Sequence, residues 1–177
     1  MLDNVVNVRQ MNKKEIKTVS NLWNKLAYNQ TSRDKYYKSN SKDLLCINNE
    51  AYFKNCYCDS NCFIFVADYK NRIIGFSELW LCKKDFFFNI EDYAYILHLF
   101  VDTGVKIDKQ KDFNPLYVPY ALCKACESKA LEKGYKYMCG DVFDFNNEMK
   151  TILKFLKFEP YRIRYVKKLE DLKWIKI

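Results

Sequence analysis

The residues of this chain best suited to proton-transfer chemistry are its single histidine, His98, and a glutamate, Glu78. His98 lies in the middle of the apolar segment YAYILHLFV, and histidine changes its charge near neutral pH, which suits a general base. Glu78, in the segment RIIGFSELWL, is the alternative base. Each residue also has a structural interpretation: His98 as a half-buried histidine hydrogen-bonded within a sheet, and Glu78 as an exposed carboxylate on a strand.

The chain has eight cysteines, and three of them, Cys56, Cys58 and Cys62, lie close together in the sequence. Thiolates at this spacing could bind zinc, but a closed structural site needs four ligands, usually in two well-spaced pairs. The only histidine is far along the chain. We therefore expect free thiols and no metal site.

The chain is basic, with 30 Lys and Arg against 22 Asp and Glu and a formal net charge of +8. Such a charge favours anionic partners, which include nucleic acid, a membrane surface and a phosphate-bearing cofactor. The basic residues are spread along the chain, so we expect no nucleic-acid partner. Apolar runs fall short of the roughly 18 residues needed to cross a bilayer, so we expect no membrane partner.

The amino-terminal residues bear on the cellular location. Asp3 and Asn4 stand where a signal peptide has basic residues, and no apolar segment follows them. These residues predict a cytoplasmic protein.

Periodicity predicts the elements of the first half. Residues 5–9 alternate as a strand, and residues 13–28 have the apolar spacing of an amphipathic helix. A short helix is expected around the apolar positions between 44 and 53. Residues 62–67 and 72–81 are strand-like runs on either side of a polar turn and predict a hairpin.

The second half alternates strands and helices. Residues 93–101 predict a strand, residues 121–133 a helix ending before Gly134, residues 135–143 a strand and residues 146–156 a helix. Two further strand-like stretches follow, at 158–165 and 172–177. The order predicts a single α/β (α+β) domain over residues 1–177, with a mixed sheet flanked by helices.

Five segments of the chain, in this order and spacing, resemble the GNAT superfamily of acyl-CoA-dependent N-acetyltransferases. They are VRQMNKKEIKTVSNLWNKL, IFVADYKNRIIGFSELWL, YILHLFVD, ALCKACESKALEKGYKYM and FNNEMKTILKFLKFEPYRIRYVKKL. The resemblance implies a splayed, mostly antiparallel twisted sheet. It also implies transfer of an acetyl group from acetyl-CoA to a primary amine of a small molecule or peptide, with Leu99 and Val101 giving main-chain contacts to the pantetheine arm.

The resemblance also assigns residues to the pyrophosphate of acetyl-CoA. In the family, a glycine-rich loop before a helix presents backbone N–H groups to this anion. Here Tyr117 and Pro119 occupy the two glycine positions, which predicts an altered loop, and Lys106, Lys109 and Lys111 could assist. The expected cofactor contacts in this region and beyond it are Leu116, Tyr117, Val118, Tyr120, Ala121 and Asn146; Asn146 could equally cap a helix.

A second departure concerns the general acid. The position of the family's tyrosine in the last helix holds Leu153, which cannot transfer a proton. Together with Tyr117 and Pro119, Leu153 keeps open the alternative of a degenerate GNAT-fold binding or regulatory protein that has lost acetyl-CoA. The three aromatics at 86–88 could pack in the core, line an acceptor pocket or mark a homodimer surface.

Overall fold

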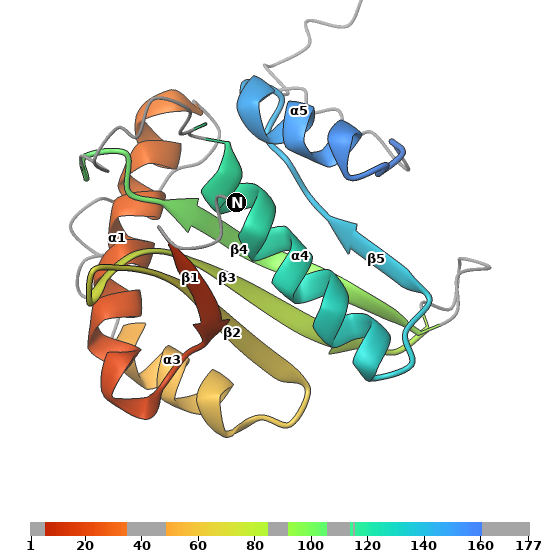
Figure 1. Cartoon of the computed structure of the whole chain (residues 1–177), viewed down its shortest axis with the longest axis horizontal. Coiled ribbons are helices and arrows are strands. Elements are labelled where there is room, and N and C mark those ends of the chain that lie inside the picture. Colours follow the sequence, from red (N-terminus) through yellow and green to blue (C-terminus); the bar gives the residue numbers. More distant parts are fainter. Residues whose placement is uncertain (1–5, 35–48, 85–91, 106–113, 115, 161–177) are drawn as a thin grey trace, which may run out of the picture.

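The computed structural model describes residues 6–34, 49–84, 92–105, 114 and 116–160. Five strands form one sheet in the order β1-β2-β3-β4-β5 (Figure 1). Neighbouring strands are antiparallel except β4 and β5, which are parallel. The strands are β1 (Asn7–Gln10), β2 (Cys62–Tyr69), β3 (Arg72–Cys82), β4 (Tyr93–Val101) and β5 (Tyr137–Gly140).

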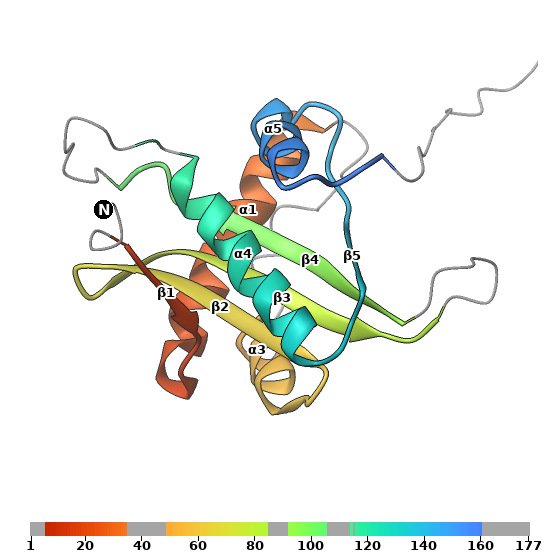
Figure 2. The same cartoon turned by 45° about the vertical axis from the view of Figure 1, so that its right-hand side comes forward.

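Helices cover both faces of this sheet, as Figures 1 and 2 show from two directions. α1 (Ile16–Arg33), preceded by the 3₁₀ turn η1 (Lys13–Glu15), and α3 (Asn49–Cys58) pack on one face, where Val19, Phe53 and Phe76 belong to one apolar cluster. α4 (Tyr117–Glu132) and α5 (Asn147–Phe155) pack on the other face, where Leu122 and Ile152 belong to a second cluster. The structure therefore confirms the mixed, helix-flanked sheet.

The hairpin of β2 and β3 follows from its turn residues. Lys70 and Asn71 both have positive φ, 50° and 64°, as the two central residues of a type I′ turn require. The two strands pair in register from Tyr69 with Arg72 to Cys62 with Trp80, with one irregularity between Ala67 and Asp68. This confirms the predicted hairpin.

A bulge in β4 changes which side chains face which layer. Glu78 pairs with His98 and Leu79 pairs with Ile96, so Leu97 is an extra residue in the ladder. Strict alternation would put Ile96 and His98 on one face. Because of the bulge, Ile96 packs in the cluster under α4, whereas the side chain of His98 lies on the α1 face, against Trp23.

β4 and β5 pair over only part of their length. Their parallel pairing runs from Tyr93 with Tyr137 to Ile96 with Gly140, and β4 then continues for five residues without β5 beside it. In both views the two strands diverge beyond this point, and α4 begins beside the carboxyl end of β4 (Figures 1 and 2).

Several predicted boundaries are wrong, and one error matters for the site. The helix expected at 121–133 begins at Tyr117, because proline is compatible with the first turn of a helix, where its missing N–H has no helical acceptor. β5 is shorter than the predicted 135–143, and residues 158–160 form no strand. Predictions for residues 44–48, 86–88, 161–165 and 172–177 lie outside the described residues. Among the described helices, none has the length and apolar character to span a membrane.

Candidate active site

Glu78 and His98, which the sequence offered as alternative bases, form one hydrogen-bonded pair. They lie opposite each other on β3 and β4, and Nδ1 of His98 is 2.8 Å from Oε2 of Glu78. The Glu78 side chain is fully buried, whereas that of His98 is 22% exposed. The interpretation of Glu78 as an exposed strand carboxylate is therefore wrong, because its side chain faces the layer under α3 rather than solvent.

Three further groups surround the Glu78 carboxylate. Tyr52 on α3 donates its hydroxyl to Oε1 at 2.5 Å, and Nε1 of Trp80 donates to the same oxygen at 2.6 Å. The thiol of Cys56 lies 3.9 Å from that oxygen. Burial by itself raises the pKa of Glu78, but hydrogen bonds from His98, Tyr52 and Trp80 outweigh it and lower that pKa below its ordinary value. Glu78 is thus held as a carboxylate inside the protein.

Trp23 on α1 contacts the other nitrogen of the His98 ring. Its Nε1 donates to Nε2 of His98 at 3.3 Å, and the two rings meet edge to face. A ring that accepts at Nε2 and donates from Nδ1 to a carboxylate is the tautomer with one proton, on Nδ1. His98 therefore presents a lone pair at Nε2, the nitrogen that is not held by Glu78, and this arrangement can accept a proton.

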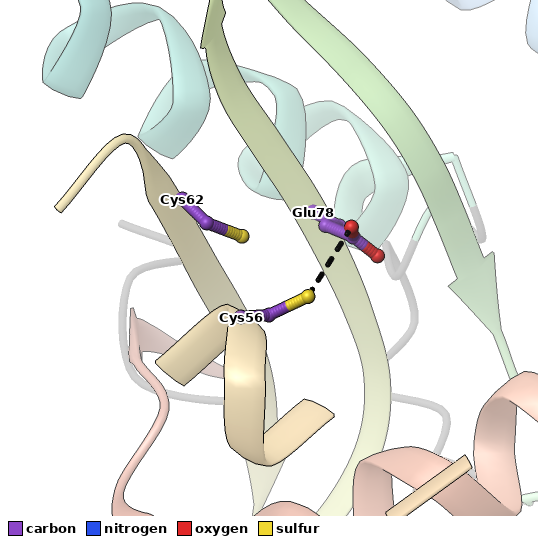
Figure 3. Close-up of side chains that lie close together, drawn as sticks. All are labelled: Cys56, Cys62 and Glu78. Carbon is purple, nitrogen blue, oxygen red and sulfur yellow. Dashed lines mark hydrogen bonds between the residues drawn. The ribbon is translucent and has the colours of Figure 1, made fainter. Parts of the chain in front are cut away.

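Two cysteines adjoin this network. Figure 3 shows the sulfurs of Cys56, in the last turn of α3, and Cys62, the first residue of β2, on the same side of the Glu78 carboxylate. One ligand atom from each of the three residues lies within 4.8 Å of the others. The sequence had grouped these two cysteines with Cys58, but the side chain of Cys58 is exposed.

Leu99 and Val101 direct backbone groups toward the space where β5 has diverged. The N–H of Asp102 donates to the carbonyl of Ile74 on β3 at 2.7 Å. Because backbone groups alternate along an antiparallel strand, Phe100 also faces β3, and Leu99 and Val101 face away from it. Beyond the pair Ile96 and Gly140, no strand in the described part of the chain pairs with this edge.

The start of α4 has fewer free donors than the predicted loop required. Tyr117, Val118, Tyr120 and Ala121 all lie in the helix, and Leu116 is its N-cap residue. The N–H of Tyr117 donates to the carbonyl of Asn114, and the N–H of Leu116 donates to the side chain of Asn114. Pro119 has no N–H to offer. In the first turn of α4, the N–H of Val118 is therefore the backbone donor for which the described residues supply no acceptor. The lysines at 106, 109 and 111 lie outside the described residues.

The remaining predicted residues lie on and before α5. The side chain of Asn146 accepts from the N–H of Met149, so Asn146 caps α5. This is one of the two roles that the sequence offered for Asn146, the other being a cofactor contact. Leu153 occupies the helix position that the resemblance gave to a tyrosine. Tyr120 lies nearby, with its ring in edge contact with that of Phe155.

Sequence reasoning offered Tyr52 as one of several aromatics that could line an acceptor pocket, but it missed the contacts of Trp23, Tyr52 and Trp80 with the Glu78–His98 pair. Trp80 could have been found, because residues two apart on a strand share a face, and it follows Glu78 by two. Trp23 and Tyr52 come from separate helices, and periodicity gives no information on which helix residue meets a given strand residue.

This fold is that of the GNAT acetyltransferases, as comparison with solved structures shows. An aminoglycoside N-acetyltransferase, AAC(6')-Iy, in complex with CoA, matches with a TM-score of 0.68 at 18% identity, over 92% of this chain and 94% of that chain. A tetramutant of the BH1408 protein from Bacillus halodurans matches with a TM-score of 0.73 at 16% identity, over 92% and 99% of the two chains.

An aminoglycoside acetyltransferase, meta-AAC0020, from an uncultured soil metagenomic sample, in complex with sisomicin, has the same fold. It matches with a TM-score of 0.63 at 16% identity, over 96% of this chain and 100% of that chain. No family model matches the sequence, and no curated protein matches it. The resemblance to the GNAT superfamily is thus confirmed for the fold.

Proposed function

We propose that this protein is an acyl-CoA-dependent N-acetyltransferase that transfers an acetyl group from acetyl-CoA to a primary amine by direct attack. The observation that carries the proposal is the outer edge of β4, where Leu99 and Val101 direct backbone groups into the divergence from β5. A pantetheine arm contains amides, and an unpaired strand edge offers donors and acceptors to amides as a neighbouring strand would. The similar solved enzyme in complex with CoA supports this choice of cosubstrate.

The catalytic roles follow from the order of the groups along β4. A protonated amine has no lone pair, so attack on a thioester needs a base that takes its proton. His98 takes it at Nε2, and Glu78 stabilises the resulting imidazolium through Nδ1. The bulge at Leu97 adds a backbone unit outside the ladder beside His98, and its N–H is a candidate donor to the thioester carbonyl.

The leaving group needs less assistance than the amine. A thiol has an ordinary pKa of about 8.5, so the departing sulfur leaves as a thiolate without an obligatory acid. Solvent or Tyr120 can return the proton afterwards, which is compatible with Leu153 in α5. The acceptor is a small-molecule or peptide amine; the neighbour in complex with sisomicin favours a small molecule.

The first test is calorimetric titration with acetyl-CoA and with CoA at low and moderate salt. Micromolar affinity that weakens as salt rises is the expected result, because few backbone donors remain at the start of α4 and cationic side chains must hold the phosphates. No heat and no thermal shift at millimolar cosubstrate would reject the enzyme and leave a GNAT-fold binding protein. An amine screen, with release of CoA as the signal, follows a positive result.

A further inference from the structure

Cys56 and Cys62 bring two thiols together in the interior of the protein. Cys56 is 2% exposed and Cys62 is 6% exposed, and their sulfurs lie within 4.8 Å of each other (Figure 3). A tight connection joins the two residues: the N–H of Asp59 donates to the carbonyl of Cys56, and the N–H of Cys62 donates to that of Asp59. The turn therefore keeps the two sulfurs close together, and a disulfide forms when they move to a bonding distance of about 2 Å.

The two thiols are electrostatically unequal. A hydrogen bond from Cys62 lowers the pKa of Cys56 despite burial, whereas the same contact and burial raise the pKa of Cys62. The thiolate is the reactive form of cysteine, so this inequality favours Cys56 as the attacking member and Cys62 as the resolving one. Burial raises the pKa values of Cys123 and Cys126 to about 12, which makes these buried thiols poor nucleophiles at neutral pH.

We propose that Cys56 and Cys62 are an oxidative modification site, at which hydrogen peroxide converts the two thiols to a disulfide and thereby removes the Cys56 thiol from the Glu78 carboxylate. The Cys56 sulfur attacks one peroxide oxygen, the O–O bond breaks, and a sulfenic acid and water form. The Cys62 sulfur then attacks the Cys56 sulfur, the S–S bond forms, and the S–O bond breaks with loss of a second water. Two thiols give up two electrons, and one peroxide becomes two waters.

The same cluster is less suited to a metal ion. Oε1 of Glu78 already accepts from Tyr52 and Trp80, and Oε2 faces His98, so a metal would have to displace a donor from the carboxylate. The described residues also supply three ligand atoms, whereas a closed zinc site has four. A disulfide needs no group other than the two sulfurs.

Oxidation at this site alters the surroundings of His98 through Glu78. The Cys56 thiol lies 3.9 Å from Oε1 of Glu78, and a disulfide has no S–H to donate. The other oxygen of the same carboxylate faces His98. Because His98 is the single histidine, its imidazole resonance reports this change without any enzyme assay.

Peptide mapping tests the disulfide directly. The purified chain, reduced and treated with EDTA, is oxidised with stoichiometric hydrogen peroxide, its remaining thiols are alkylated, and it is cleaved before Asp59, which separates Cys58 from Cys62. We expect two of the eight thiols to be lost and a cross-linked peptide pair joining Cys56 to Cys62. A C58A variant is the matched control and must form the same link, because Cys58 is exposed and outside the pair.

Loss of the link in C58A, or a peptide joining Cys58 to Cys62, would overturn the assignment. So would alkylation of both Cys56 and Cys62 after peroxide treatment. Protection of both thiols by added Zn²⁺ in the wild type, but not in E78Q, would identify a metal site instead.

The His98 resonance tests the coupling. Oxidation should shift it in the wild type and in C58A, reversibly with dithiothreitol, and should leave it unchanged in C56S, which has no thiol at residue 56 beside the Glu78 carboxylate to oxidise. An unchanged resonance in fully cross-linked wild type would overturn the coupling to Glu78. Since neither readout uses acetyl-CoA, failure here is distinguishable from failure of the acetyltransferase proposal.

Discussion

His98 and Glu78 face each other across β3 and β4, with Nδ1 of the imidazole 2.8 Å from Oε2 of a fully buried carboxylate. The bulge at Leu97 makes this possible, because it turns His98 to the face that Glu78 already occupies. The pair therefore depends on backbone geometry as well as on residue type. We expect His98 to act as the base and Glu78 to stabilise its imidazolium, and separate substitutions of the two residues test these two roles.

Replacing His98 by glutamine tests the base. H98Q removes a proton acceptor but leaves a polar side chain at a partly exposed strand position, so we expect the fold and acetyl-CoA affinity to remain. The rate of acetyl transfer at neutral pH should fall by about 10²-fold or more, the usual contribution of a positioned base. Steady-state kinetics with calorimetry on the same sample measures both. An unchanged rate would show that solvent removes the proton.

Replacing Glu78 by glutamine tests the carboxylate. Its oxygens accept from His98, Tyr52 and Trp80, and an amide would point an NH₂ group at one or more of these donors. We expect a loss of about 2–4 kcal/mol in the free energy of unfolding, measured with urea. If E78Q folds, its rate of acetyl transfer at neutral pH should fall, because no carboxylate then stabilises the imidazolium that forms when His98 takes the amine proton. Equal stability of E78Q and wild type would contradict this account.

The sequence predicted the strands from β2 to β4 well, because each has a continuous apolar run and the turn at Lys70 and Asn71 is specific. It also selected both members of the Glu78–His98 pair. It could not join them, because the bulge at Leu97 arises from tertiary pairing and leaves no mark on hydrophobic alternation. The error at α4 had another cause: Pro119 was interpreted as a loop residue, although its backbone suits a first helical turn.

Gly75 permits the close approach of β3 to β4 at the carboxyl end of β4. A Cβ on Gly75 would lie 2.8 Å from the carbonyl oxygen of Phe100, a backbone atom that cannot move aside. We expect G75A to lower the free energy of unfolding by about 1–3 kcal/mol, as for other overpacked sites. G140A is the matched control, because its Cβ would lie 3.4 Å from the carbonyl of Ile96, and its thermal midpoint should change little. Equal effects of the two substitutions would argue against this tight contact.

The ion pair between Arg9 and Glu15 predicts a specific pH dependence of stability. The hydrogen bond from Arg9, 2.7 Å long, lowers the pKa of Glu15 against the effect of burial. A carboxyl whose pKa is lower in the folded state stabilises the fold above its unfolded pKa and loses this contribution as the pH falls through the folded value. R9M should therefore cost about 1 kcal/mol at neutral pH and less at about pH 3, measured by urea unfolding. K17M removes an exposed charge from the neighbouring helix α1 and should show no such difference between the two pH values.

Replacing Trp23 by phenylalanine tests whether access to Nε2 of His98 limits proton transfer. Its indole N–H occupies the lone pair that the amine proton must reach, but at 3.3 Å the hydrogen bond is long. W23F keeps an aromatic ring against His98 and removes the donor. Because breaking so long a bond costs less than about 1 kcal/mol, the rate at saturating amine should rise, by about fivefold at most. The coupling between Trp23 and His98 is measured by comparing the rates of W23F, H98Q and the double variant. If Trp23 acts only through His98, W23F does not change the rate in the H98Q background. A fall of about tenfold or more in W23F alone would mean that Trp23 orients the imidazole instead.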